Sequence, residues 1–223
     1  AGADMALGSP FGGDDRLFLG LFAGYGDTQA DFDDGLGTLD LTGTMLGAYA
    51  TYTVAGFYLD FVVSYQSLNF ETYNTTTTGT ANYDGSAWGG SLEAGYRIDL
   101  GGFDIEPQVQ LTYVNVSHES FVDSMGASVE DDEGHSLQLR GGLRASTSFK
   151  LDEGVMLRPY VDLGVIHEFA DANDVVVLGT TMSDALYDTA YEVGGGAALS
   201  LPGGMQVFID VDYRGASDYS SVN

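Results

Sequence analysis

Histidines beside carboxylates are the residues of this chain best able to activate water. Each of the three histidines has acidic neighbours: His118-Glu119, Asp132-Glu133-His135, and His167-Glu168 with Asp171 and Asp174. A His–carboxylate pair can take a proton from water, as hydrolysis requires. However, histidines at the rims of predicted strands are ordinarily solvated, and no Gly-x-Ser-x-Gly, Walker or His-Glu-x-x-His motif accompanies them. We therefore expect no enzymatic turnover.

Two acidic stretches have ligand types that suit Ca²⁺. They are Asp31-Phe32-Asp33-Asp34-Gly35 and Glu130-Asp131-Asp132-Glu133-Gly134. Neither has the ligand spacing of an EF-hand loop. We predict solvated acidic loops, which divalent ions could bridge to anionic lipopolysaccharide, and we expect no metal site and no cofactor.

The overall charge excludes one class of partner. The net charge is −26, and only 7 residues are Lys or Arg. A surface that binds phosphates needs clustered basic residues, so nucleic acid is excluded. High negative charge also keeps soluble proteins apart in solution, so composition alone would allow a soluble acidic protein.

Alternation with a period of two organises the chain, most clearly over residues 88–113. From Trp88 to Leu100 the even positions are largely apolar and the odd positions include Glu93 and Arg97; after the glycine turn at 101–102, the odd positions up to Tyr113 are apolar. This period indicates β-strands. Strands with one apolar and one charged face are typical of a transmembrane β-barrel with lipid outside and a polar lumen inside.

The same pattern recurs along the whole chain. A strand tail at 2–7 precedes predicted strands at 16–27, 41–54, 57–66, 88–100, 103–113, 136–151, 157–170, 191–201 and 205–214. Connections near 55, 101, 153 and 203 are short, whereas those at 28–38, 70–85, 122–135 and 171–187 are long and polar. Outer-membrane barrels have short periplasmic turns and long extracellular loops. The sequence thus predicts one all-β domain over 1–223, an antiparallel transmembrane barrel.

Charged residues are predicted to line the lumen. All seven basic residues fall on polar faces, as expected when Lys or Arg facing lipid costs about 2–4 kcal/mol. The predicted lumen-facing charges are Arg97, Arg140, Arg144, Lys150, Arg158, Arg214, Asp60, Glu93, Glu106, Asp162, Glu168, Glu192, Asp210 and Asp212. We expect them to form a network of both signs, whose individual pairs the sequence leaves open.

Aromatic residues are predicted to form two girdles at the membrane interfaces. The members are Phe57, Phe103 and Phe149 at the short-turn end, and Tyr65, Trp88, Tyr113 and Tyr213 further along the outer face. At about 3.3 Å per residue and with tilted strands, the rings lie on the order of 20–25 Å apart, which matches an outer-membrane apolar band.

Two other functions agree with parts of this pattern. A stand-alone small outer-membrane barrel could present its long loops as an adhesin-like surface. A soluble acidic β-sandwich that binds calcium or a glycan would also point its charges outward. The strict alternation of short and long connections favours the membrane barrel over the sandwich.

Several segments, in order and spacing, resemble the translocator domain of classical monomeric autotransporters (type V secretion). They are FLGLFAGYG, GAYATYTVAGFYLDFVVSY, SLEAGYRIDLGGFDIEPQVQLTYV, SLQLRGGLR, LRPYVDLGVIHEF and YEVGGGAALSL. The resemblance implies a twelve-stranded barrel in the bacterial outer membrane that anchors and exports an N-terminal passenger, with a helix threading the pore. It also implies contact with outer-membrane lipid, lipopolysaccharide and the barrel-assembly machinery.

The resemblance is incomplete at both ends of the chain. The family ends in a strand whose last residue is aromatic, whereas this chain ends at Asn223 just after a predicted strand that rises to the long-loop end. Ala1 lies where the second family strand begins. We therefore expect a barrel that lacks its first and last strands, with about nine full strands and a stub present.

Overall fold

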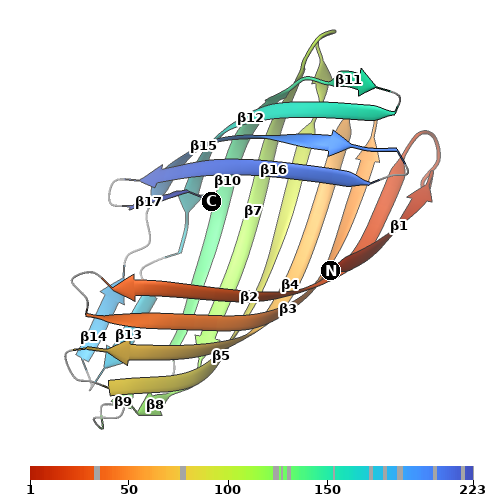
Figure 1. Ribbon diagram of the computed structural model, residues 1–223. Helices are drawn as coiled ribbons and strands as arrows, with labels where there is room; N and C mark the ends of the chain where they lie inside the picture. Colours follow the sequence, from red (N-terminus) through yellow and green to blue (C-terminus); the bar gives the residue numbers. More distant parts are fainter. Residues whose placement is uncertain are drawn as a thin grey trace.

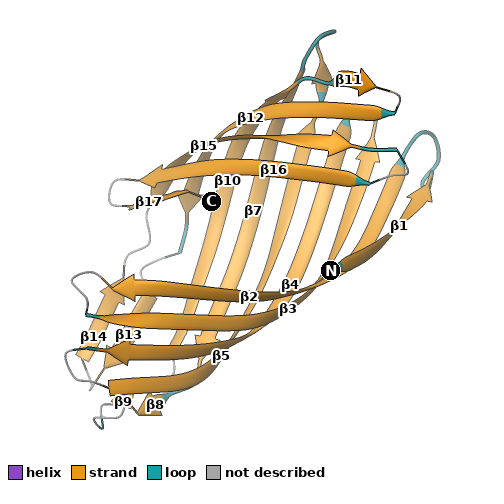
Figure 2. Ribbon diagram, in the orientation of Figure 1, coloured by secondary structure: helices purple, strands orange, loops and turns teal. Residues whose placement is uncertain are grey.

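The structure, a computed structural model, describes residues 1–32, 36–75, 79–122, 126, 128–129, 132–152, 154–170, 173–177, 180–184, 188–202, 205–216 and 219–222. Within these ranges the chain consists of strands and the turns between them (Figures 1 and 2). None of the described residues belongs to a helix long and apolar enough to cross a membrane.

Nine long antiparallel strands and a shorter first strand form the main sheet. They are β1 (Gly2–Gly8), β2 (Arg16–Phe32), β3 (Gly37–Val54), β4 (Phe57–Asn74), β5 (Gly79–Tyr96), β7 (Asp104–His118), β10 (Asp132–Ser146), β12 (Val155–Glu168), β15 (Thr189–Ser200) and β16 (Gln206–Ala216). Each pairs with the next one in this order. The predicted all-β antiparallel fold, with nine full strands and a stub, is confirmed.

Short strands complete two sheets. In the main sheet, β6 (Ile98–Asp99) and β11 (Phe149–Asp152) continue β5 and β10 toward the short turns, and β17 (Tyr219–Val222) turns back along β16. Residues 219–222 thus pair with β16, where the sequence predicted no further strand. A second sheet is made by β8 (Phe121–Val122), β9 (Ser128–Val129), β13 (Asn173–Val177) and β14 (Thr180–Asp184).

Two of the predicted long loops are largely strand. Residues 28–32 and 37–38 belong to β2 and β3, and residues 70–74 and 79–85 belong to β4 and β5. The registers of these four strands run without a shift from one end to the other. Their many Thr, Asn and Asp residues predict loops, yet their side chains still alternate with a period of two, which is why they continue the strands.

The main sheet is curled, and its order runs from β1 to β17 (Figure 1). On one face, side chains meet across an intervening strand: Tyr49 of β3 reaches Asp4 of β1, and Arg158 of β12 reaches Asp104 of β7. Curvature brings side chains together only on the concave side, so we call this face the inner face. The predicted completion of the barrel by further strands stays a prediction.

The outer face carries the large apolar side chains. Leu21 is 69% exposed, Leu46 65%, Val161 58% and Ile209 70%, and similar residues occupy the same face of every long strand. An apolar surface of this extent is not stable against water. It is the surface that lipid covers in a membrane barrel.

Glycines opposite aromatic residues allow the inner face to be crowded. Tyr49 pairs with Gly20 and Phe22 pairs with Gly47 across β2 and β3. A Cβ at Gly20 would lie 2.1 Å from the Tyr49 ring, and one at Gly47 would lie 2.1 Å from the Phe22 ring. Tyr58 lies over Gly95 in the same way, with 2.4 Å to such a Cβ. Each ring therefore fills the space that its glycine partner leaves.

A side chain at Gly20 should therefore destabilise the sheet. We expect Gly20→Val to lower the free energy of unfolding by about 1–3 kcal/mol, because the Tyr49 ring has to leave its site. Urea unfolding in detergent would measure this. Gly26→Val is the matched control, since a Cβ at Gly26, on the same face of β2, meets nothing within 4 Å. Equal losses in the two variants would contradict the packing argument.

Candidate functional site

Glu192 is the junction of a charged network on the inner face. Its Oε1 accepts hydrogen bonds from Nε and Nη2 of Arg140 at 2.8 and 2.6 Å, and its Oε2 accepts one from Nη2 of Arg214 at 3.0 Å. Only 9% of the Glu192 side chain and 15% of the Arg140 side chain are exposed. Charged hydrogen bonds with this little water around them are stronger than surface ion pairs.

A glycine on the intervening strand makes this ion pair possible. Arg140 is on β10 and Glu192 on β15, and β12 runs between them with Gly164 opposite Glu192. A Cβ at Gly164 would lie 3.3 Å from Nε of Arg140 and 3.5 Å from Oε1 of Glu192. The guanidinium group therefore reaches its carboxylate over the backbone of Gly164.

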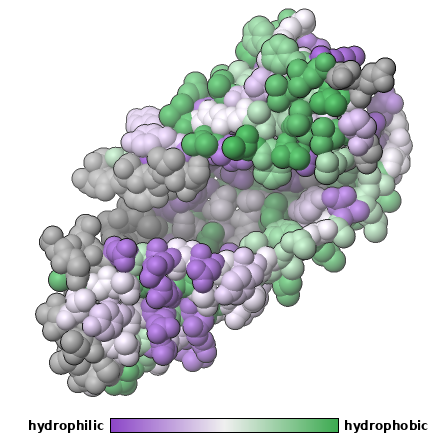
Figure 3. All heavy atoms as spheres, viewed as in Figure 1, coloured by the Kyte–Doolittle hydropathy of each residue, from purple (hydrophilic) through white to green (hydrophobic). Residues whose placement is uncertain are grey.

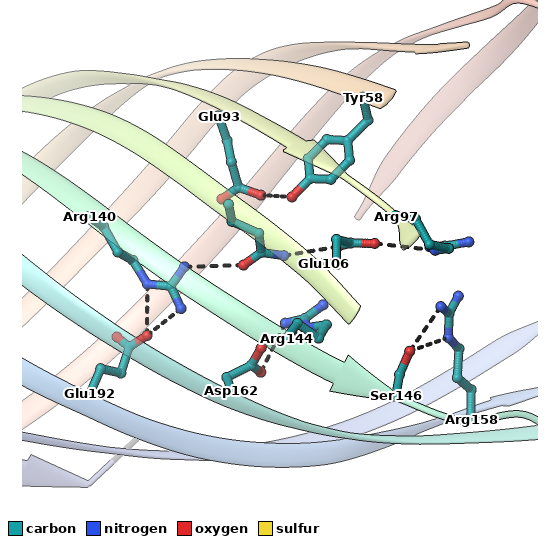
Figure 4. A network of polar contacts seen from close by, with 11 residues as sticks. Tyr58, Glu93, Arg97, Glu106, Arg140, Arg144, Ser146, Arg158, Asp162 and Glu192 are labelled. Atoms are coloured by element: carbon teal, nitrogen blue, oxygen red, sulfur yellow. Dashed lines mark hydrogen bonds and ion pairs between the residues drawn. The ribbon is translucent and has the colours of Figure 1, made fainter. Parts of the chain in front are cut away.

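The network continues from Arg140 toward the short turns (Figure 4). Nη1 of Arg140 donates to Oε1 of Gln108 at 3.3 Å, and Nε2 of Gln108 donates to Oε1 of Glu106 at 3.0 Å. Nε of Arg97 donates to the other oxygen of Glu106 at 3.2 Å. The Arg97 side chain is 47% exposed, so this last pair contributes less than the one at Glu192.

Two further arginines are held near the same wall. Nε and Nη2 of Arg144 donate to the two oxygens of Asp162 at 2.7 and 3.1 Å, and its guanidinium carbon lies 4.4 Å from the centre of the Tyr160 ring. Arg158 donates from Nη2 to Asp104 at 2.9 Å and to Ser146 at 3.0 Å. A planar guanidinium group with two or more partners has little freedom to reorient.

Acids on β1 to β5 are held by hydroxyl groups. Tyr58 donates to Glu93 at 2.6 Å, Tyr49 donates to Asp4 at 2.8 Å, and Thr51 donates to Asp60. Among the described residues, no ion pair within 4.0 Å includes Asp60, Glu93, Asp210, Asp212 or Lys150. The positive side chains of the predicted set thus pair mainly with acids of β7, β12 and β15.

Glu168 is a structural acceptor at the long-loop end of β12. It accepts four hydrogen bonds: from Ser136 Oγ at 2.5 Å, Leu137 N at 2.7 Å, Ala170 N at 3.0 Å and Gln138 Nε2 at 3.1 Å. It is 5% exposed. A buried carboxylate with four donors in the protein ties the end of β12 to β10.

Two of the histidines make separate contacts in the described part of the chain. Nδ1 of His167 lies 3.2 Å from Thr189 and 3.6 Å from Asp188, and its ring is edge-on to Phe169, whereas His118 lies edge-on to Tyr83. The side chains that the structure describes include no cluster of three or more His, Cys, Asp or Glu residues able to hold a metal ion. Asp33, Asp34, Gly35, Glu130, Asp131 and Asp171 lie outside the described residues, as do the side chains of Phe32, Asp132 and Asp174.

Three members of the predicted girdle nearer the long loops, here called the upper girdle (Tyr65, Trp88, Tyr113 and Tyr213), are neighbours on the outer face. Tyr65 pairs with Trp88 across β4 and β5, and the Trp88 and Tyr113 rings are 5.1 Å apart. Trp88 is 50% exposed and Tyr213, on β16, is 48% exposed. At the other end Phe103 and Phe149 are about half exposed, and Phe57 starts β4. Their contact with the membrane interface remains a prediction.

Some members of the network were not among the predicted lumen-facing charges. Alternation places Asp104, Gln108 and Ser146 on the polar face of Glu106 and Arg144, but it did not predict their contacts. The role of Gly164 had no signal in the sequence, because a gap between side chains is visible only when three neighbouring strands are in register. The network as a whole offers charges of both signs that are fixed by their partners.

Comparison with known proteins identifies relatives over nearly the whole chain. Residues 1–212 match the family described as the autotransporter beta-domain. The probable autotransporter YcgV of Escherichia coli K12 is 29% identical over 96% of this chain, and the autotransporter CRAC of Citrobacter rodentium is 27% identical over 92%. The chain spans 24% and 13% of the lengths of these two relatives.

Solved structures show the same architecture. The β domain of the Bordetella autotransporter BrkA is 26% identical, with a TM-score of 0.81 over 99% of this chain and 84% of that one. The transport unit of AIDA-I from Escherichia coli shares the fold, with a TM-score of 0.85 at 17% identity, over 99% of this chain and 77% of that one.

Removing the charge of Glu192 should destabilise the inner face. We expect Glu192→Gln to cost about 2–4 kcal/mol, because Arg140 and Arg214 would both lose their partly buried partner. Arg97→Gln is the control and should cost less than about 1 kcal/mol, since that pair is half exposed. Urea unfolding in detergent compares the two variants; a smaller loss for Glu192→Gln than for Arg97→Gln would be evidence against this ranking.

Trp88 is the only tryptophan of the chain, so its fluorescence reports the depth of the upper girdle. In liposomes, we expect lipids brominated near the carbonyl groups to quench it more than lipids brominated at the chain ends, because indole rings prefer the interface. A Trp88→Phe variant gives the background. Stronger quenching from the chain ends would place Trp88 away from the interface.

Proposed function

Because the chain belongs to the autotransporter β-domain family, we propose that it anchors an N-terminal passenger and forms the lumen wall along which one passenger segment is exported. The domain is an outer-membrane translocator of a Gram-negative bacterium, as its family and structural relatives are. This location excludes the soluble β-sandwich considered from the sequence. The match to the autotransporter β-domain family favours the translocator over a stand-alone barrel with adhesin-like loops.

The arginine–carboxylate network on the inner face carries this proposal. A polypeptide that crosses the membrane in a lumen keeps its backbone hydrated only if the wall is polar. The wall of β7 to β16 provides such a surface, and its arginines Arg140, Arg144, Arg158 and Arg214 are held in ion pairs. Arginines that already have carboxylate partners do not hold a passing segment by strong new ion pairs.

Other partners follow from the outer face and from the family. The exposed apolar side chains suit outer-membrane lipid, and in this proposal the polar strand ends beyond the upper girdle would lie at the level of lipopolysaccharide head groups. Insertion would use the barrel-assembly machinery, as the resemblance implies. The inner-face charges would position the passenger, and no enzymatic turnover belongs to this domain.

Reversing two charges of the network tests the proposal in the native gene product, with an epitope tag on the N-terminal side of Ala1. Arg140→Glu with Arg144→Glu would face Glu192 and Asp162 with like charges. We expect the tag to reach the cell surface roughly tenfold more slowly, because the repulsion energy between adjacent like charges exceeds thermal energy and distorts the wall. Protease accessibility of the tag on intact cells measures the rate.

Two controls separate export from folding. Heat-modifiable migration in gels shows whether the variant barrel has formed. The variant Arg144→Asp with Asp162→Arg exchanges the two partners of one ion pair. It keeps the net charge and leaves an arginine beside an aspartate, so its export rate should be near that of the parent. A folded double-reversal variant with unchanged export would show that these charges are not needed.

A further inference from the structure

The polarity of the inner face reverses along the same strands. Toward the short turns, the inner side chains of β3 to β5 are polar, for example Thr51, Asp60 and Glu93, which lie opposite one another in register. Toward the long loops, the corresponding row is Leu41, Phe70 and Tyr83. The registers have no shift between the two rows, so both rows lie on the inner face.

The polarity of the outer face changes in the opposite direction: it is apolar toward the short turns and polar toward the long loops. Beyond Tyr65 and Trp88 it carries Thr42, Thr44, Ser67, Asn69, Asp84 and Ser86. Nδ2 of Asn69 donates to Asp84 at 2.8 Å across β4 and β5. Figure 3 shows hydrophilic side chains over the ends of β2 and β3 nearest the long loops. These strand ends face water on the outside, so lipid does not account for the apolar residues on their inner side.

A groove lies within this apolar part of the inner face. We call it the exit groove: its floor is Gly24, Gly26 and Gly43, and its apolar walls are Leu41, Met45 and Leu68, with a volume of about 210 Å³. Tyr25, Thr28 and Gln66 complete the lining. A Cβ at Gly26 would meet nothing within 4 Å, whereas one at Gly43 would lie 2.9 Å from Leu68 Cδ2. The glycines therefore give the groove its depth, and its walls are apolar apart from Thr28 and Gln66.

The neighbouring part of the same surface shows which side chains it accepts. Phe121 of β8 stacks on Tyr83 with 4.2 Å between ring centres, and Tyr83 stacks on Phe70 at 4.8 Å. The interplanar angles are 5° and 6°. An aromatic side chain from a short extended segment thus already packs here, one strand away from the exit groove, whose lining comes only from β2, β3 and β4.

We propose that the exit groove binds the passenger segment as it leaves the lumen, accepting apolar side chains two residues apart on an extended chain. This inference rests on the proposed function. The groove lies on β2 to β4, and toward the short turns the inner face of β3 to β5 carries Thr51, Asp60 and Glu93. A segment that passes these residues toward the long loops reaches the groove next. The passenger's apolar side chains gain little free energy on the hydrated wall, whereas the groove removes them from water. This difference favours movement of the segment toward the exit side.

Site-specific photo-crosslinking in the tagged native gene product tests the contact. Benzoylphenylalanine would replace Leu41 in the groove, Thr42 on the opposite face of the same strand, or Gln110 on the inner face of β7. Export is halted by a disulfide loop in the passenger before irradiation. We expect the tagged segment to crosslink at Leu41 and Gln110 and not at Thr42.

The other outcomes separate the two proposals. A crosslink at Gln110 without one at Leu41 would overturn the exit groove and leave the translocator intact. No crosslink at either position would overturn both. Equal crosslinking at Leu41 and Thr42 would show contact without a preferred face, which also overturns the groove.

Loss of one apolar wall residue provides a second readout. Leu68→Asn should slow surface exposure of the tag about tenfold, the effect of removing one partly desolvated side chain. Ser67→Asn, the adjacent outward position, is the matched control and should export at the parent rate. Heat-modifiable migration confirms that each barrel has formed, and an unchanged rate in folded Leu68→Asn would contradict the proposal.

Discussion

Backbone hydrogen bonding in lipid is the constraint on which the rest of this structure depends. A peptide group in the hydrocarbon region has no water to bond, so its N–H and C=O groups need partners within the protein. The chain meets this requirement with long antiparallel strands whose registers run almost without a shift. Once the ladder is continuous, side chains must alternate between lipid and interior, and each strand acquires two faces of opposite polarity.

Curvature then creates a second constraint, because side chains converge on the inner face. Two solutions recur. Aromatic rings lie over glycines of the neighbouring strand, as Tyr49 does over Gly20, and long charged side chains cross a neighbouring strand at a glycine, as Arg140 does at Gly164. The charged network is therefore a packing arrangement as much as an electrostatic one. Its geometry depends on where β10, β12 and β15 have small residues.

The reversal of polarity beyond the upper girdle has the same origin. Where β3 to β5 leave the apolar band, water replaces lipid on the outer face, and polar side chains such as Asn69 and Asp84 take that side. The inner side is then free to carry Leu41, Leu68 and Phe70. Part of this apolar surface is covered by Phe121 from a long connection, which ties the second sheet to the wall of the barrel.

The sequence by itself determined the strands, their faces and the family. Alternation places Arg140, Glu192 and Trp88 on their faces without any coordinates, because the period of a strand is a local property. It did not reveal how far β2 to β5 extend. Residues 28–38 and 70–85 are rich in polar side chains, and in these strand ends the apolar side chains are on the inner face and no longer on the outer face. Only the tertiary structure decided that Arg140 pairs with Glu192 over Gly164, and that Leu41 and Leu68 form a groove. Those contacts join residues far apart in the sequence, and they depend on register and curvature, which no single strand encodes.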